Sequence, residues 1–245
     1  MAVANSKKLT NGIVLLVSFL VVLWLIFVPF EGLGNKNTLE WSDDLFNKLS
    51  KGSSYFIPAM QKIADKYQGN IFEVSYPIKV KAAKMNKFEL IKVLTSIVPM
   101  ADATVTAAGD HITLKADLGK LLTQVNKDSD LMYKNDGKAI VDVYHIDEKK
   151  VISAWWELLS QAILPMQKKG LHGEAMAMDK VSKKSLEPAL NYYTIPAESI
   201  GSKWLTVTCL LVFYVIYTLW YGYGIFELFA GMGLSASKPK AKKEV

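Results

Sequence analysis

The sequence contains no arginine, since all 29 basic side chains among its 245 residues are lysines. The planar guanidinium fork is therefore missing, which excludes arginine fingers and bidentate arginine recognition of guanine. Cysteine is scarce as well, because Cys209 stands alone. A single thiol closes no internal disulfide and is too few for a zinc ribbon or an iron–sulfur cluster.

The common catalytic signatures are also absent. The sequence has no Walker loop and no GxGxxG, GxSxG or HExxH motif. Because no residue pattern points to a nucleophile, a base or a ligand set, we predict no catalytic residue, no cofactor and no metal site. We therefore do not expect an enzyme.

The three histidines each have a structural explanation. Residues 172–174 read His-Gly-Glu, the H-x-E spacing of zinc deaminases, but the cysteines that those enzymes need are missing. His145 precedes Asp147 and Glu148, a set that could bind a metal, although acids at this position are typical of a helix N-terminus. We predict an N-cap there, and we expect His111 to be solvated beside a hairpin turn.

Residues 126–130 imitate the start of an EF-hand loop, because Asn126, Asp128 and Asp130 fall at positions one, three and five. Position six is Leu131 in place of the glycine that makes the sharp turn, and position twelve is Gly137 in place of the bidentate glutamate. We therefore predict a polar helix face at this segment and no calcium site.

Two long apolar runs are the strongest features that the sequence does contain. The first, residues 12–30, has no charge and would be about 28 Å long as a helix, close to the ~30 Å hydrocarbon core of a bilayer. A cleaved signal peptide is the alternative, because Lys7 and Lys8 precede the run. The run is long for a signal peptide and lacks a small-x-small cleavage site after Pro29, so we predict an uncleaved transmembrane helix.

The second apolar run, residues 204–226, has no charge and would be about 34 Å long as a helix. Trp204 can mark one membrane interface. Trp220, Tyr221 and Tyr223 cluster toward the other, as in an aromatic belt. We predict a second transmembrane helix, with the lipid bilayer as its solvent.

Lysines at the outer ends of the two runs predict the orientation. Lys7 and Lys8 precede the first run, and four lysines follow the second: Lys238, Lys240, Lys242 and Lys243. By the positive-inside rule, residues 1–11 and the tail 227–245 are cytoplasmic, and residues 31–203 are periplasmic or extracellular. The absence of an N-x-S/T sequon and of a disulfide pair fits a bacterial inner membrane.

The net charge of +6 largely follows from this topology. Residues 31–203 hold 23 lysines and 21 acids, so the surplus of positive charge lies mainly at the ends of the chain. Nucleic-acid binding needs a basic face with stacking aromatics or a reading motif, and we find neither. We expect no nucleic-acid partner.

The region between the two runs predicts an α+β domain in which a small β-α-β-β-α layer is followed by a helical hairpin. After a linker at 32–37, apolar spacing predicts two helices or one bent helix up to Gly69. Alternating patterns predict strands at 71–80, 104–107 and 111–115, and Pro77 argues for an edge strand. Asn86 can cap a helix whose apolar residues are Phe88, Leu90, Ile91, Leu94, Ile97 and Val98.

Three further helices are predicted. One covers residues 118–134, with Leu118, Leu121, Leu122, Val125 and Met132 facing inward. The second begins at the cap Asp147 and ends at Lys168, with an apolar set of Val151, Trp155, Leu158, Leu159, Ala162 and Leu164. The third covers residues 174–191 and is bent or broken near Pro188.

A tyrosine stripe in the second apolar run is the candidate partner-binding site. Tyr214, Tyr217 and Tyr221 recur at helical spacing, and Leu210 extends the same stripe. Hydroxyls at bilayer depth need hydrogen-bond partners, and the first run offers only Ser18 and a tryptophan. The stripe either docks on another membrane subunit or a second copy of the chain, or it packs within the chain with Tyr221 reaching the interface.

These observations favour a non-catalytic subunit or scaffold of a membrane protein complex, with an extracytoplasmic interaction domain and a docking transmembrane helix. The alternative is a membrane-anchored domain that binds or senses a ligand outside the cell. A large apolar pocket with converging polar groups would favour that alternative.

Overall fold

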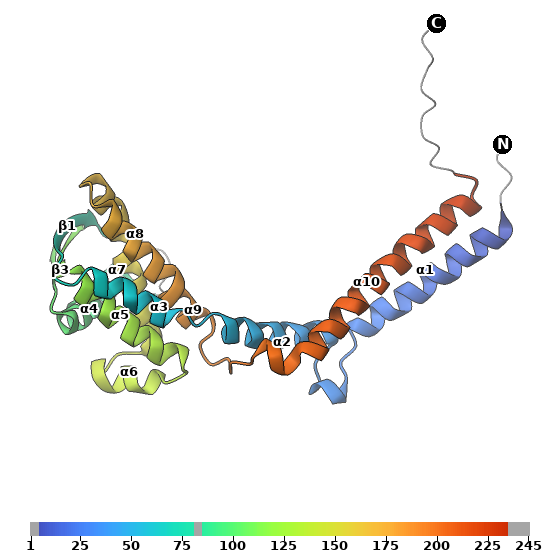
Figure 1. The fold of residues 1–245 in the computed structure, drawn as a ribbon, viewed down its shortest axis with the longest axis horizontal. Coiled ribbons are helices and arrows are strands. Elements are labelled where there is room, and N and C mark those ends of the chain that lie inside the picture. Colours follow the sequence, from blue (N-terminus) through green and yellow to red (C-terminus); the bar gives the residue numbers. More distant parts are fainter. Residues whose placement is uncertain (1–4, 81–84, 235–245) are drawn as a thin grey trace, which may run out of the picture. The chain divides into compact units, whose positions relative to one another are not determined.

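The computed structural model describes residues 5–80 and 85–234 and is mostly helical, with a small three-stranded antiparallel sheet (Figure 1). Helix thus outweighs strand more strongly than the predicted α+β class suggests. The chain divides into two compact units. Unit 1 comprises the residues up to Phe46 and those from Ser199 onward, and unit 2 comprises Asn47–Glu198. The lysines at positions 238 to 243, on which the predicted orientation depends, lie outside the described residues.

Unit 1 is built on two antiparallel helices that lie side by side, α1 (Ser6–Ile26) and α10 (Ile200–Gly231) (Figure 1). Both are long and apolar enough to cross a membrane. Helix α1 begins before the predicted start and ends four residues early, because the backbone before Pro29 disfavours the helical region. Helix α10 extends past both predicted ends, since Ser199 caps its N-terminus and the residues up to Gly231 continue the helix past Glu227.

Glycines allow the backbones of α1 and α10 to approach closely. A Cβ atom added at Gly12 would lie 2.5 Å from the backbone nitrogen of Leu228, and one added at Gly231 would overlap the backbone of Leu9. The amide of Asn5 donates to the carbonyl of Gly231 at 3.0 Å. Small residues at a helix contact are the usual means of packing between apolar helices.

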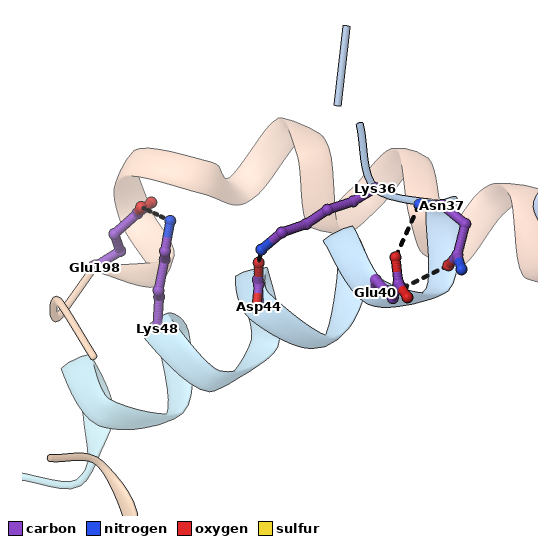
Figure 2. Close-up of polar contacts among 6 residues, drawn as sticks. All are labelled: Lys36, Asn37, Glu40, Asp44, Lys48 and Glu198. Atoms are coloured by element: carbon purple, nitrogen blue, oxygen red, sulfur yellow. Dashed lines mark hydrogen bonds and ion pairs between the residues drawn. The ribbon is translucent and has the colours of Figure 1, made fainter. Parts of the chain in front are cut away.

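The predicted linker after α1 is a tight turn. It contains the 3₁₀ helix η1 (Glu31–Leu33), followed by Gly34 in the left-handed region. Phe30 and Lys36 form an isolated antiparallel β-bridge across the turn. Helix α2 (Thr38–Ser53) then begins at a capping box. The Asn37 side chain accepts from the amide of Glu40 at 2.9 Å, and the Glu40 carboxylate accepts from the amide of Asn37 at 3.2 Å (Figure 2). Lys36 forms an ion pair with Asp44 nearby.

The sheet of unit 2 has the order β1-β3-β2 and consists of β1 (Ile71–Pro77), β2 (Thr104–Ala108) and β3 (His111–Asp117). The hairpin predicted between the second and third strands is confirmed, with Gly109 at a φ of +58° in its turn. Strand β1 lies at the edge, as Pro77 predicts. Its side chains alternate between exposed and buried, so one face of the sheet carries the core.

Helices pack on that face. The elements after α2 are α3 (Ile57–Lys66), α4 (Lys87–Ile97), η2 (Val98–Ala101), α5 (Leu118–Tyr133), α6 (Gly137–Tyr144), α7 (Glu148–Lys168), α8 (His172–Val181), the π-helical segment η3 (Ser182–Leu186) and α9 (Glu187–Asn191). Helix α6 was not predicted. Asp136 initiates it by accepting from the amide of Ala139, because the turn that ends α5 also supplies an N-cap.

Most of the predicted core is confirmed, with two errors of the same kind. The caps at Asn86 and Asp147 are present, and the inward residues predicted for 118–134 are fully buried. Phe88 and Leu164, however, are 78% and 58% exposed. Each lies two positions from a buried helical residue and therefore points to the opposite side of its helix.

Candidate functional site

The predicted tyrosine stripe lies along one side of the contact between α1 and α10. The ring of Tyr217 stacks on Phe19 of α1 with centroids 4.3 Å apart, and Tyr221 lies 5.0 Å from the same ring. Tyr214 lies one turn before Tyr217 in α10 and is 66% exposed. Leu210 is half-buried. The stripe therefore combines contacts within the chain at Tyr217 and Tyr221 with an open position at Tyr214.

A second polar residue extends the exposed part of α10. Thr218 follows Tyr214 by four residues and donates its hydroxyl to the Tyr214 carbonyl at 2.7 Å. Gly222 follows after another four, and a Cβ atom added there would meet nothing within 4 Å. The packing of α10 on α1 therefore does not require a glycine at this position. We refer to Tyr214, Thr218 and Gly222 as the outer face of α10.

Two buried donors between α1 and α10 have no hydrogen-bond partner in the described part of the chain. They are the Tyr217 hydroxyl and the indole nitrogen of Trp220. Ser18 does not serve them, because its hydroxyl donates to the carbonyls of Val14 and Leu15 in its own helix. An unpaired polar group in a dry environment costs about 1–3 kcal/mol.

An apolar groove lies on the opposite side of the helix contact from the tyrosine stripe. It has a volume of about 550 Å³ and is lined by α1 and by Trp220. Trp220 and Tyr221 are adjacent in sequence and project about 100° apart, so they lie on either side of the contact line. The α1–α10 pair thus presents an apolar groove on one side and tyrosines on the other.

Unit 2 contains a buried carboxylate that sequence reasoning missed. Asp128 accepts hydrogen bonds from the Tyr144 hydroxyl at 2.7 Å, the Trp155 indole at 2.8 Å and the Gln124 amide at 3.0 Å. Burial raises the pKa of Asp128, and the three donors oppose that effect. Because donors from α5, α6 and α7 converge on it, the group orients three helices and resembles a structural element more than a catalytic acid.

The expectation of a polar helix face at 126–130 is therefore wrong for part of the segment. Asn126, Asp128 and Ser129 lie in α5 but are buried. The Asn126 side chain accepts from the Ser185 hydroxyl at 2.7 Å. Asn126 and Asp128 bond side chains of neighbouring helices, whereas the Ser129 hydroxyl donates to the Val125 carbonyl of its own helix at 2.7 Å. A single sequence does not reveal partners that come from other helices.

A buried lysine holds the segment that leaves unit 2. The ammonium group of Lys51 donates to the carbonyl oxygens of Tyr192 and Ile195, at 2.9 and 2.7 Å, and to the side chain of Asn135 at 2.8 Å. Burial lowers the pKa of Lys51. Three acceptors match the three donors of an ammonium group, so the charge is fully coordinated.

The same segment is held at a second point. The amide of Glu198 donates to the carbonyl of Lys48 at 3.1 Å, and the side chains of these residues form an ion pair at 3.5 Å (Figure 2). Gly52 is needed here, because a Cβ atom at this position would overlap the carbonyl oxygen of Glu198. These contacts join α2 to residues 192–198.

The three histidines take no part in the hydrogen-bond clusters around Asp128 and Lys51. His145 ends α6 at a φ of +53°, and Asp147 caps α7, which confirms the N-cap interpretation. His111 is exposed at the start of β3, as predicted, and His172 begins α8. Within residues 5–80 and 85–234, no group of three histidine, cysteine or acidic side chains is arranged to hold a metal ion.

Comparisons with protein-family models, with curated proteins and with solved structures found no match for this chain.

Proposed function

We propose that the chain is a non-catalytic subunit or scaffold of a membrane protein complex, in which α1 and α10 span the bilayer and α10 docks on another membrane subunit or on a second copy of the chain. Unit 2 is then an interaction domain on the outer side of the membrane. The lengths and apolar character of the two helices support the membrane location.

The exposed tyrosine of the outer face carries the docking proposal. Tyr214 presents an exposed hydroxyl on this side of α10, and hydrocarbon offers it no hydrogen-bond partner, whereas the neighbouring Thr218 hydroxyl already donates to the backbone. A neighbouring helix supplies one at a gain of about 0.6–2 kcal/mol. Gly222 supports the same interpretation, because a helical glycine costs about 1 kcal/mol relative to alanine and the contact with α1 does not need it.

The orientation belongs to the same proposal. Lysines in the first turn of α1 and after α10 favour a cytoplasmic location for both termini in a bacterial inner membrane, with residues 31–203 on the periplasmic side. Unit 2 has its own buried core of about forty apolar residues, which supports a domain that folds around its own interior.

Native gel migration in a mild detergent tests the docking. We expect wild-type protein purified from its membrane to migrate as a complex, and we expect Tyr214→Phe combined with Thr218→Val to weaken that complex. Tyr223→Phe is the matched control, because Tyr223 is also exposed but lies on a different side of α10. A wild-type monomer, or a complex that the double substitution leaves unchanged, would refute the docking proposal.

Tyr217→Phe separates the two interpretations of the stripe. Its hydroxyl is buried against α1 without a partner in the described chain, so its removal is neutral or stabilising if the helix pair is complete by itself. If a partner subunit supplies an acceptor, the same substitution weakens the complex.

A further inference from the structure

A second groove lies in unit 2, between the edge strand β1 and the C-terminal half of α7. It has a volume of about 550 Å³, and its lining includes Ser75 and Pro77 from the strand and Leu164 and Pro165 from the helix. It lies in a different unit from the outer face of α10. The helix-docking proposal does not explain it.

The outer edge of β1 is an incomplete β-ladder. The hydrogen bonds from Leu118 to Asn70 and from Ile78 to Asp110 place the even-numbered residues of β1 in bonded pairs with the β3 side. In an antiparallel ladder, the odd-numbered residues then direct their N–H and C=O groups toward the free edge. Ser75 is the odd-numbered residue that lines the groove, so its peptide groups face the space where a further strand would lie.

The residues on either side of Ser75 show that this edge accepts amide and ammonium groups. The Gln161 side chain bonds both peptide groups of Lys79, accepting from its N–H at 2.9 Å and donating to its carbonyl, as a neighbouring strand would. The ammonium group of Lys169 donates to the carbonyl of Glu73 at 2.7 Å. The protein thus covers both ends of the edge with its own side chains.

The helix side of the groove supplies an apolar contact. Leu164 is 58% exposed although it lies in a helix that packs on the core, and it lines the groove beside Pro165. Because proline has no N–H, the carbonyl of Gln161 loses its usual helical donor. The wall opposite Ser75 therefore combines an exposed leucine with a backbone acceptor.

The charge of the groove has one sign. Lys79, Lys168 and Lys169 line it, and acidic residues do not. Within the described residues, none of these three ammonium groups forms an ion pair with a carboxylate. Strand β1 carries one acid, Glu73, whose side chain is on the exposed face of the sheet, opposite the core face.

We propose that this groove binds an extended acidic segment of a partner protein by strand addition to β1. The peptide groups of the segment pair with Ser75, an apolar side chain of the segment contacts Leu164, and its carboxylates pair with Lys79 and Lys168. Strand addition draws affinity from main-chain hydrogen bonds and specificity from alternate side chains. Charge complementarity favours an acidic sequence. This surface does not include α10, so the test of strand addition is separate from the test of helix docking.

Fluorescence anisotropy with labelled eight-residue peptides tests the proposal on the full chain in mild detergent. The probe alternates valine and glutamate. One control replaces each glutamate by lysine, and a second keeps the glutamates but carries N-methyl groups on alternate peptide bonds. We expect the probe to bind at least about tenfold more tightly than either control, and more weakly at high salt. Equal binding of the N-methylated peptide would refute strand addition, and no binding of the probe would refute the proposal.

Substitutions locate the binding. The double substitution Lys79→Glu with Lys168→Glu should lower the affinity for the probe at least about tenfold. Lys62→Glu with Lys92→Glu should leave the affinity unchanged, because those exposed lysines lie outside the groove. Hydrogen exchange should slow at the Ser75 amide when the probe binds. Unchanged exchange there, or equal effects of the two double substitutions, would show that the peptide binds elsewhere.

Discussion

Asp128 links three helices in the interior of unit 2. Three donors from separate helices converge on its carboxylate, and two of them, Tyr144 and Trp155, are buried. Removing the carboxylate leaves the Tyr144 and Trp155 donors without this acceptor, which costs more than a single lost hydrogen bond, whereas the Gln124 amide keeps its bond to the Tyr144 hydroxyl. The sequence marks Asp128 only as one acid in a polar segment.

We predict that Asp128→Ala lowers the free energy of unfolding of unit 2 by about 2–4 kcal/mol, because the indole of Trp155 and the hydroxyl of Tyr144 lose their acceptor. Urea titration of the full chain in detergent, followed by tryptophan fluorescence, measures this. Asp142→Ala is the control, since Asp142 is exposed and its ion pair with Lys138 is solvated. Similar losses for the two variants would contradict the assigned role.

The pKa of Asp128 also predicts a pH dependence. Burial raises this pKa in the folded state above the ordinary value of 3.8, so the folded protein holds the proton more tightly than the unfolded chain. The contribution of Asp128 to stability is therefore greatest below pH 3.8 and decreases as pH rises through the folded-state pKa. The difference in unfolding free energy between wild type and Asp128→Asn should decrease over this range. A difference that stays constant or increases with pH would contradict a raised pKa of Asp128 in the folded protein.

At the scale of elements, the close contact between α1 and α10 depends on glycine. Gly12 and Gly231 are each needed because a side chain would meet the backbone of the other helix, whereas Gly222 lies on the outer face with open space around it. The same residue type therefore has two different roles on the two sides of α10.

We predict that Gly12→Leu weakens the association of α1 with α10 by about 1–3 kcal/mol, because the added side chain overpacks the contact. Disulfide formation between cysteines placed at Phe19 and Tyr217, whose rings stack at 4.3 Å, measures the contact in a background without Cys209. Gly222→Leu should leave this crosslink unchanged. A crosslink that is insensitive to Gly12→Leu would mean that the two helices do not pack through this glycine.

At the scale of the whole molecule, the arrangement of charges along the chain predicts its topology. A phosphatase reporter inserted at the exposed turn Gly109–Asp110 should be active, and one fused after Val245 should be silent, because the lysines that flank the two spans predict cytoplasmic termini by the positive-inside rule. The opposite pair of results would reverse the orientation and place unit 2 in the cytoplasm.

The local sequence determined much of the secondary structure. Caps at Asn86 and Asp147, the turn at Gly109 and the length of the two apolar runs each act over a few residues, so they can be read directly from the chain. Apolar periodicity also identified most of the core. It failed at Phe88 and Leu164, where an apolar residue lies on the wrong side of an otherwise regular helix.

Only the tertiary structure decided which polar groups meet. Lys51 and its acceptors at Tyr192 and Ile195 are separated by more than a hundred residues, and Ser75 faces Leu164 across a groove formed by a strand and a helix. Hydrogen bonds and grooves depend on distances between atoms that are remote in the chain. The sequence alone established two apolar helices and a lysine-only charge pattern, whereas the packing of those elements determined which tyrosines contact Phe19 of α1 and which edge of the sheet is open.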